Sequence, residues 1–300
     1  MSTATAPDVA AAAAATDAPP ERLHPLRQFV SDRLAATGLV IVLVLSLAAV
    51  FAPVLAPHDP TVIDPLRGLE GSSRQHPLGT DELGRDVLSR LLVGARWSLG
   101  IAALATMSVM VVGTMIGLVA GYVGGWVDGL VMRIVDALLA LPNLLLYLAI
   151  IGTLGPGIRN VFIALVSISW ASYARVMRGM VLSVRERTFV RASRSLGAGD
   201  GRLMFRHILP NVISPIVVLA TLQLGGTILA LAALGFFGLG AQPPTPEWGT
   251  MINQGRLFLQ TNPTLMIYPG VAISLAVLGF NLMGDGLRDV LDPQLARQGR

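Results

Sequence analysis

The chain contains no cysteine and no lysine, and charged residues of all kinds make up only 13% of its 300 residues. The absence of cysteine excludes disulfides and thiolate metal sites. Average soluble domains carry about 25% charged residues. The low charge, the 53% hydrophobic content and the mean hydropathy of +0.65 therefore indicate a polytopic membrane protein. Its net charge of +4 comes from arginine alone. We attribute this excess to membrane topology and expect no nucleic-acid partner.

Long apolar runs predict six transmembrane helices, since about 20 apolar residues cross a hydrocarbon core of ~30 Å. Arg22, Arg27 and Arg33 precede the first run, and a strongly basic segment separates the fourth run from the fifth. The positive-inside rule then places both termini and the basic segment in the cytoplasm. The predicted spans cover about residues 34–55, 99–119, 128–152, 161–181, 212–239 and 265–283.

The predicted fold is thus an all-α integral membrane protein that crosses the membrane several times. We divide the chain into a disordered alanine-rich cytoplasmic tail (1–21), an N-terminal anchor helix (22–56), an outer loop with an amphipathic helix (57–97), a core of five transmembrane helices (98–288) with the basic loop 185–211, and a cytoplasmic C-terminal tail (289–300).

Two patterns predict local contacts near the second span. An amphipathic helix at the membrane surface is expected from Asp81 onward, with an i, i+4 ion pair between Asp86 and Arg90. Further along, Gly113 and Gly117 form a small-xxx-small pair that suits close helix contact.

Later spans carry their own signals. Arg133 is expected to pair with Asp136 at one end of the third span, and Pro142 is expected to kink this helix. The fifth span is long, and we expect it to be interrupted at Gly225 and Gly226.

The basic loop 185–211 is the most informative stretch of the chain. Helix-forming residues at 189–196 and 203–209 flank Gly197, Gly199 and Gly201, which predicts two short helices around a bend. Pro210 is expected to end the second helix, because proline lacks the amide that a continuing helix needs. A loop that served only topology would need neither the glycine break nor the Leu-Pro stop.

Other chemistry is weakly represented. The glycines at 197–201 lack the following Lys-Ser or Lys-Thr of a phosphate loop, so ATP would have to bind another chain. His58, His76 and His207 lie far apart in sequence, and we expect no metal site from them. No nucleophile, base and acid stand in a catalytic arrangement, so we expect no enzyme activity.

These residues resemble the permease subunits of binding-protein-dependent ABC importers, in the dipeptide, oligopeptide and nickel branch. The family signature is Glu-Ala-Ala, three residues, Gly, nine residues, then Ile-x-Leu-Pro. Here Arg191-Ala192-Ser193 is followed by Gly197 and Leu209-Pro210 at the matching spacing. The chain departs from the signature at Arg191, at Ser193 and at His207, which stands in the isoleucine position. Segments 76–99, 121–142 and 281–293 extend the resemblance over most of residues 22–293.

The resemblance implies a type I ABC importer permease of the second-permease type. Its implied partners are a second homologous permease, two cytoplasmic ABC ATPases that bind ATP and Mg, an extracytoplasmic substrate-binding protein and the lipid bilayer. This chain itself would bind no cofactor. The implied ATPase-coupling residues are Arg191, Ala192, Ser193, Gly197, Asp200, Leu203, Phe205, His207, Leu209 and Pro210, with Leu203, Met204, Phe205 and Ile208 as the apolar face. For the translocation pathway we select Gln223, Gly225, Gly226 and Asn281.

Two alternatives stay open at this point. An autonomous ion-coupled secondary transporter would need intramembrane acids near mid-span, and a membrane-embedded enzyme would need a catalytic set. The solute also stays open among a dipeptide, a longer peptide, glutathione, a nickel chelate and haem, as does whether the partner permease is a distinct chain or an identical copy.

Overall fold

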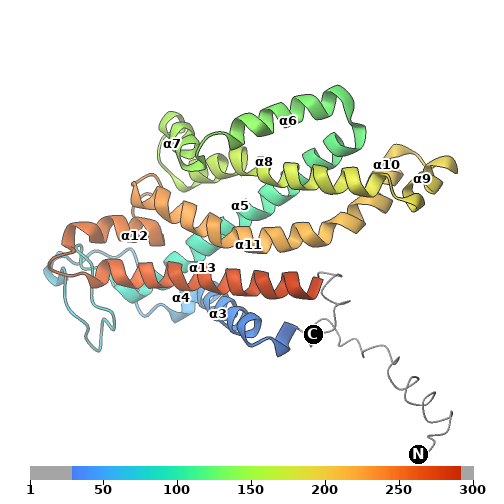
Figure 1. Ribbon diagram of the computed structural model, residues 1–300. Helices are drawn as coiled ribbons and strands as arrows, with labels where there is room; N and C mark the ends of the chain where they lie inside the picture. Colours follow the sequence, from blue (N-terminus) through green and yellow to red (C-terminus); the bar gives the residue numbers. More distant parts are fainter. Residues whose placement is uncertain (1–28, 292–300) are drawn as a thin grey trace, which may run out of the picture.

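The computed structural model describes residues 29–291, which form a bundle of long helices with shorter helices at both ends (Figure 1). The predicted tail 1–21 lies outside these residues, and the predicted tail 289–300 begins too early, because the last helix reaches Leu291. Within the described range no strand occurs. The helices are α3 (Arg33–Val50), α4 (Ala52–Leu55), α5 (Val87–Val123), α6 (Gly125–Leu139), α7 (Asn143–Leu154), α8 (Ile158–Arg185), α9 (Thr188–Ser195), α10 (Asp200–Arg202), α11 (Leu209–Phe236), α12 (Trp248–Gly255) and α13 (Thr264–Leu291).

Five helices are long and apolar enough to cross a membrane: α3, α5, α8, the continuous α10–α11 unit and α13. A sixth span arises if α6 and α7 count as one, although a bend of 93° separates them. The bend lies at Leu141 and Pro142, where we expected a kink. The all-α membrane fold is confirmed, and the segment predicted as the third span divides into two helices because proline cannot continue the hydrogen-bond ladder.

The predicted surface helix from Asp81 is wrong. Residues up to Asp86 form irregular structure, and α5 then runs unbroken through 37 residues to Val123. Asp86 caps this helix by accepting from the Ser89 amide, so it is not the partner of Arg90. Arg90 instead pairs with Asp81, with Nε 3.2 Å from Oδ2. The predicted boundary between residues 97 and 98 is therefore eleven residues too late, since the apolar span and its polar start form one helix from Val87.

Close contact between α5 and α8 follows a row of glycines on α5. A Cβ atom built on Gly113 would lie 2.5 Å from Tyr173 Cβ, and one on Gly117 would lie 2.5 Å from the Ala174 carbonyl oxygen. Gly121 continues the row one turn further on, 3.0 Å from the Arg178 carbonyl oxygen. The small-xxx-small prediction is confirmed, and it extends to a third glycine.

Ion pairs join α6 to α8. Asp128 accepts from Arg178 Nε at 2.5 Å and from Arg178 Nη2 at 2.6 Å, and Asp136 pairs with Arg175. The predicted pair between Arg133 and Asp136 is wrong, because the acid turns toward the neighbouring helix rather than along its own.

The predicted interruption of the fifth span is also wrong, since α11 is continuous from Leu209 to Phe236. Gly225 lies against α13, where an added Cβ would meet Asn281 Oδ1 at 3.2 Å. Helical backbone tolerates the two glycines here, and Gly225 provides space for a neighbouring helix.

The connection between α11 and α13 is fixed by a buried carboxylate. Glu247 is fully buried and caps α12 by accepting from the amides of Gly249 and Thr250, while Ser98 Oγ donates to it at 3.2 Å. Burial raises the pKa of this carboxyl, and the hydrogen bonds from Gly249, Thr250 and Ser98 oppose that rise. These bonds tie the loop to α5.

We predict that Gly113→Ala lowers the thermal unfolding temperature of the purified protein in detergent. The added methyl group would overlap Tyr173 and the Trp170 carbonyl oxygen, and overpacking of this kind costs about 1–3 kcal/mol. Gly100→Ala on the same helix is the matched control, because nothing lies within 4 Å of its added Cβ. Equal unfolding temperatures for the two variants would contradict the close contact between the α5 glycines and α8.

Candidate functional site

The basic loop folds as a helix, a sharp bend and a second helix. At the end of α9 the Gly197 amide donates to the Arg194 carbonyl at 3.0 Å, and the Ala198 amide donates to the Ser193 carbonyl at 3.1 Å. This pair of bonds is a Schellman motif, with Gly197 at φ +84° in the left-handed position that favours glycine. Gly197 alone of the three glycines has positive φ, so it makes the bend while Gly199 begins α10.

The second helix does not end at Pro210 as predicted. Residues Leu203–Ile208 form a π-helix that continues directly into α11, with Pro210 in the first turn of α11. Proline is tolerated there because the first amides of a helix need no partner within it. Asp200–Phe236 is consequently one helical rod of 37 residues. π-helical turns are rare and often lie at functional sites.

One side of the loop is buried in the protein itself. Val190, Leu203 and Ile208 are fully buried in a cluster that includes Leu118 of α5 and Met177 of α8. The predicted apolar docking face is therefore wrong for Leu203 and Ile208, because their helix turns them inward. Met204 packs partly against the same cluster.

The outward side carries a different set of side chains. Phe205 is exposed as expected, and Leu196 and Phe189 join it. Around these apolar side chains lie exposed arginines. The exposed part of the loop thus combines three apolar side chains with five arginines, which are Arg187, Arg191, Arg194, Arg202 and Arg206. Of the other residues selected for coupling, Ala192, Gly197, Asp200 and Pro210 are exposed, and Ser193, His207 and Leu209 are half-buried.

A tyrosine that sequence reasoning missed braces this loop. Tyr122 lies at the last turn of α5 and donates its hydroxyl proton to the Asp200 carboxylate. Arg194 Nη2 donates to the same hydroxyl at 3.3 Å, and the Arg194 guanidinium lies 5.5 Å from the Tyr122 ring centroid. The two halves of the loop are thereby fastened to one end of α5. The feature of the sequence that could have indicated this contact is a tyrosine at the end of an apolar run.

A cavity of about 310 Å³, lined by apolar and polar side chains, lies between α5, α7, α8 and α11. Its hydrogen-bonding groups come from four helices and are partly paired with one another. Tyr147 OH lies 2.8 Å from Ser169 Oγ, and Thr106 Oγ1 donates to Thr227 Oγ1 at 3.1 Å. The polar lining is Thr106 of α5, Asn143 and Tyr147 of α7, Ser169, Ser172 and Tyr173 of α8, and Gln223 and Thr227 of α11.

The structure separates the four residues selected for a translocation pathway. Gln223 and Gly226 line the cavity. Gly225 and Asn281 are not among its lining residues and face each other between α11 and α13. Adjacent glycines on a helix point about 100° apart, which explains why Gly225 and Gly226 differ.

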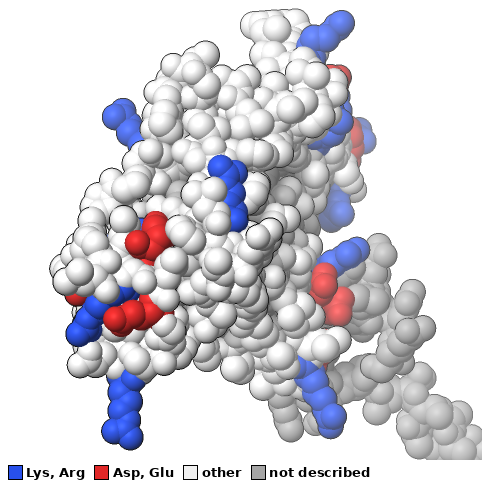
Figure 2. Space-filling view, turned by 90° about the vertical axis from the view of Figure 1, so that its left-hand side faces the viewer, with Lys and Arg blue, Asp and Glu red and all other residues white. Residues whose placement is uncertain are grey.

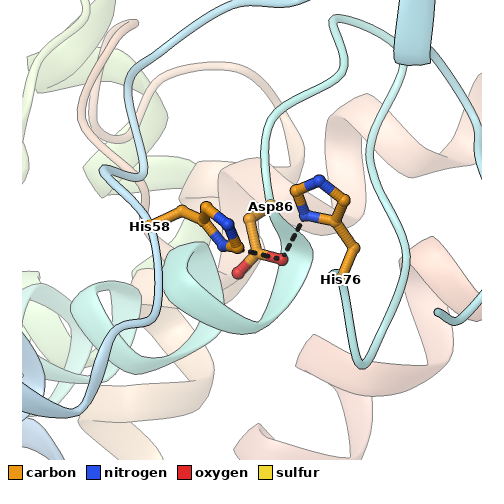
Figure 3. Close-up of side chains that lie close together, drawn as sticks. All are labelled: His58, His76 and Asp86. Atoms are coloured by element: carbon orange, nitrogen blue, oxygen red, sulfur yellow. Dashed lines mark hydrogen bonds and ion pairs between the residues drawn. The ribbon is translucent and has the colours of Figure 1, made fainter. Parts of the chain in front are cut away.

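Two histidines that are distant in sequence meet near the start of α5. His58 and His76 lie on either side of Asp86, with ring centroids 4.6 Å apart (Figure 3). We expected no metal site because the histidines are far apart in sequence, but the fold brings these two together with Asp86. His207 lies in the basic loop, near the opposite end of the bundle (Figure 1).

The end of the bundle that carries the loop before α5 has a mixed charge. Figure 2 looks onto this end, where acidic and basic side chains form small groups on a mostly uncharged surface. Buried pairs belong to this region, including Arg85 Nε and Asp81 Oδ2 at 2.7 Å. The basic loop 185–211, by contrast, is rich in arginine. This difference in charge is expected if the two ends of the bundle lie on opposite sides of a membrane.

Comparison with known proteins decides the family. The sequence profile described as the binding-protein-dependent transport system inner membrane component matches residues 113–297. The profile of the N-terminal TM domain of oligopeptide transport permease C matches residues 26–77. The chain belongs to the binding-protein-dependent transport permeases. It is a multi-pass inner-membrane protein and a non-catalytic subunit, and such permeases work with other ABC subunits and a substrate-binding protein.

Similar permeases extend over almost the whole chain. The dipeptide transport system permease protein DppC of Alkalihalophilus pseudofirmus is 45% identical over 269 residues, which is 90% of this chain and 88% of that protein. The di/tripeptide transport system permease protein DppC of Pseudomonas aeruginosa is 45% identical, covering 90% and 91%. The glutathione transport system permease protein GsiD of Escherichia coli is 46% identical, covering 90% and 89%.

We predict that Gly197→Ala lowers the transport activity of the assembled complex. Alanine in the left-handed position costs roughly 1–2 kcal/mol, so the bend would open. Gly199→Ala is the matched control, since Gly199 has φ −68° and nothing lies within 4 Å of its added Cβ. The measurement is transport-stimulated ATP hydrolysis by the reconstituted complex. Equal losses in both variants would contradict a special role for the Gly197 bend.

Proposed function

We propose that this chain is the permease subunit of an ATP-driven importer for peptides, coupled to separate ATPase chains through residues 185–211. The observation that carries the proposal is the braced helix–bend–helix loop, in a chain similar to named dipeptide and glutathione permeases. A transmitted movement requires a docking element that does not deform. The Schellman bend and the buried side of the loop supply that rigidity.

The docking surface is the outward side of the loop. Phe189, Leu196 and Phe205 provide apolar contacts there, and the surrounding arginines favour a partner groove with acidic rims. We place this loop in the cytoplasm, as the positive-inside rule asks. ATP and Mg would bind the two ATPase chains, and this chain would hold neither.

Movement at the loop has a direct route to the cavity. The rod Asp200–Phe236 begins in the loop and carries Gln223 about 23 residues further on, roughly 35 Å along the helix axis. A tilt of the rod would therefore move the cavity wall as a rigid body. Tyr122 adds α5 to the same movement, since Asp200 lies on the rod.

The cavity suits peptide backbone. Its hydroxyl and amide groups donate and accept hydrogen bonds without a fixed charge, as passage of diverse peptides requires. A second homologous permease would complete the pathway across the bundle face, and the external binding protein would supply most of the selectivity. Gln223, Tyr147 and Asn143 are the residues we assign to contact with the solute.

An autonomous ion-coupled transporter fits the structure less well. Asp128 and Asp136 are the carboxylates of the α6 segment, and both are ion-paired with arginines of α8. Neither carboxylate lines the cavity between the helices, so both are poorly placed to carry an ion through it.

We predict that Gln223→Leu raises the peptide KM of uptake by roughly threefold to tenfold, because one hydrogen bond of about 0.5–1.5 kcal/mol is lost. Subunit assembly should not change. The measurement is uptake of a labelled dipeptide by the full complex in proteoliposomes, together with recovery of partner subunits on affinity purification.

Thr221→Ala serves as its control, because the Thr221 hydroxyl bonds to the Val217 carbonyl of its own helix and does not line the cavity. An unchanged KM in Gln223→Leu would contradict the assignment of Gln223 to solute contact in the cavity. Purification of the chain without any ATPase, or uptake that persists without ATP, would overturn the importer proposal as a whole.

A further inference from the structure

The cluster of His58, His76 and Asp86 brings together three segments that are separate in sequence. His58 follows α4, His76 belongs to the loop before α5, and Asp86 is the residue that caps α5 (Figure 3). One ligand-capable atom from each lies within 4.8 Å of the others. His76 Nδ1 donates to Asp86 Oδ1 at 2.9 Å, and His58 Nδ1 lies 3.8 Å from the same oxygen.

We propose that these three side chains form a binding site for a divalent transition-metal ion of the zinc type. Two imidazole nitrogens and one carboxylate oxygen are ligands that Zn²⁺ prefers, whereas Ca²⁺ and Mg²⁺ prefer oxygen ligands alone. Zinc bonds of about 2.0–2.2 Å place tetrahedral ligands about 3.4 Å apart. The observed separations of 2.9 and 3.8 Å bracket that value.

The surrounding groups hold the three ligands in place. Asp86 Oδ2 accepts from the Ser89 amide at 2.8 Å and from Ser89 Oγ at 2.6 Å, which leaves Oδ1 directed at the two imidazoles. Ser89 Oγ also accepts from the His58 amide at 3.0 Å. The His76 amide donates to Ser73 Oγ at 3.0 Å. Supporting hydrogen bonds of this kind orient metal ligands and raise affinity.

The site has an entrance and room for a fourth ligand. The Asp86 and His76 side chains are 1% and 8% exposed, whereas the His58 side chain is 42% exposed. A cavity of about 260 Å³ opens in front of all three and is also lined by Asp59 and Asp64. Three protein ligands and one open position describe a site that retains a water molecule.

Metal binding requires one rearrangement. The His76 ring must carry its proton on Nε2 instead of Nδ1, so that the Nδ1 lone pair faces the metal and the ring stays neutral. Arg67 Nη1 lies 3.4 Å from Nε2 and would lose that contact. Arg67 keeps Gln75 Oε1 as a partner at 3.0 Å and the Asp64 carboxylate at 3.7 Å. Once bound, the ion would fasten the loop before α5 to the helix start, independently of the importer function.

The test is metal binding by the full chain, purified in detergent without a histidine tag and treated with a chelator. Zn²⁺ is the probe, measured by calorimetric titration and by metal content after dialysis. We expect about one ion per chain and a rise in unfolding temperature on adding Zn²⁺. His58→Ala should weaken binding at least tenfold and abolish that rise, and Ser89→Ala should weaken it about tenfold to a hundredfold.

His207→Ala is the matched control, because it removes a histidine remote from the cluster and should bind Zn²⁺ as the unchanged protein does. His58 is partly exposed, so its loss is not expected to unfold the chain. Absence of stoichiometric Zn²⁺ from the unchanged protein would overturn the proposal. So would equal affinities for His58→Ala and His207→Ala, or an equal stabilisation by Ca²⁺.

Discussion

Backbone contact between α5 and α8 is the constraint on which the rest of this structure depends. Gly113, Gly117 and Gly121 leave no side chain between the two helices, so the longer helix lies directly on its neighbour. In a membrane the hydrophobic effect does not drive helices together, and close packing of this kind holds them instead. Both ends of α5 then become fixed points. Tyr122 at one end holds the basic loop, and Asp86 at the other end holds the loop that carries His58 and His76.

Two helices connect the basic loop 185–211 with the interior of the bundle. The rod Asp200–Phe236 passes through a π-helical segment without a break, and α5 joins it through the bond between Tyr122 and Asp200. The cavity that contains Gln223 lies between these two helices and α7 and α8. A force applied at the loop thus acts on two cavity walls through helices, which are stiff, rather than through connecting segments, which are not. This arrangement is what an energy-coupled permease needs.

Much of this architecture was predictable from the residues. Apolar runs indicated the spans, the Gly113–Gly117 spacing indicated a helix contact, and the Gly197 to Leu209-Pro210 spacing indicated the family and its loop. The predicted ion pairs were wrong where a partner was available both on the same helix and on another segment. Arg90 pairs with Asp81 of the preceding loop rather than with Asp86, and Asp136 pairs with Arg175 of α8 rather than with Arg133. A pattern read along one helix contains no information about the neighbouring helix.

The sequence by itself determined that the chain is an α-helical membrane protein of a transport-permease family, because hydropathy and short motifs are properties of local segments. Only the tertiary structure decided which face of the loop is buried, that α11 is continuous through Gly225, and that Gln223 rather than Asn281 lines the cavity. It also brought His58 and His76 to Asp86. These outcomes depend on how helices rotate against one another, and that rotation is set by packing between segments that are distant along the chain.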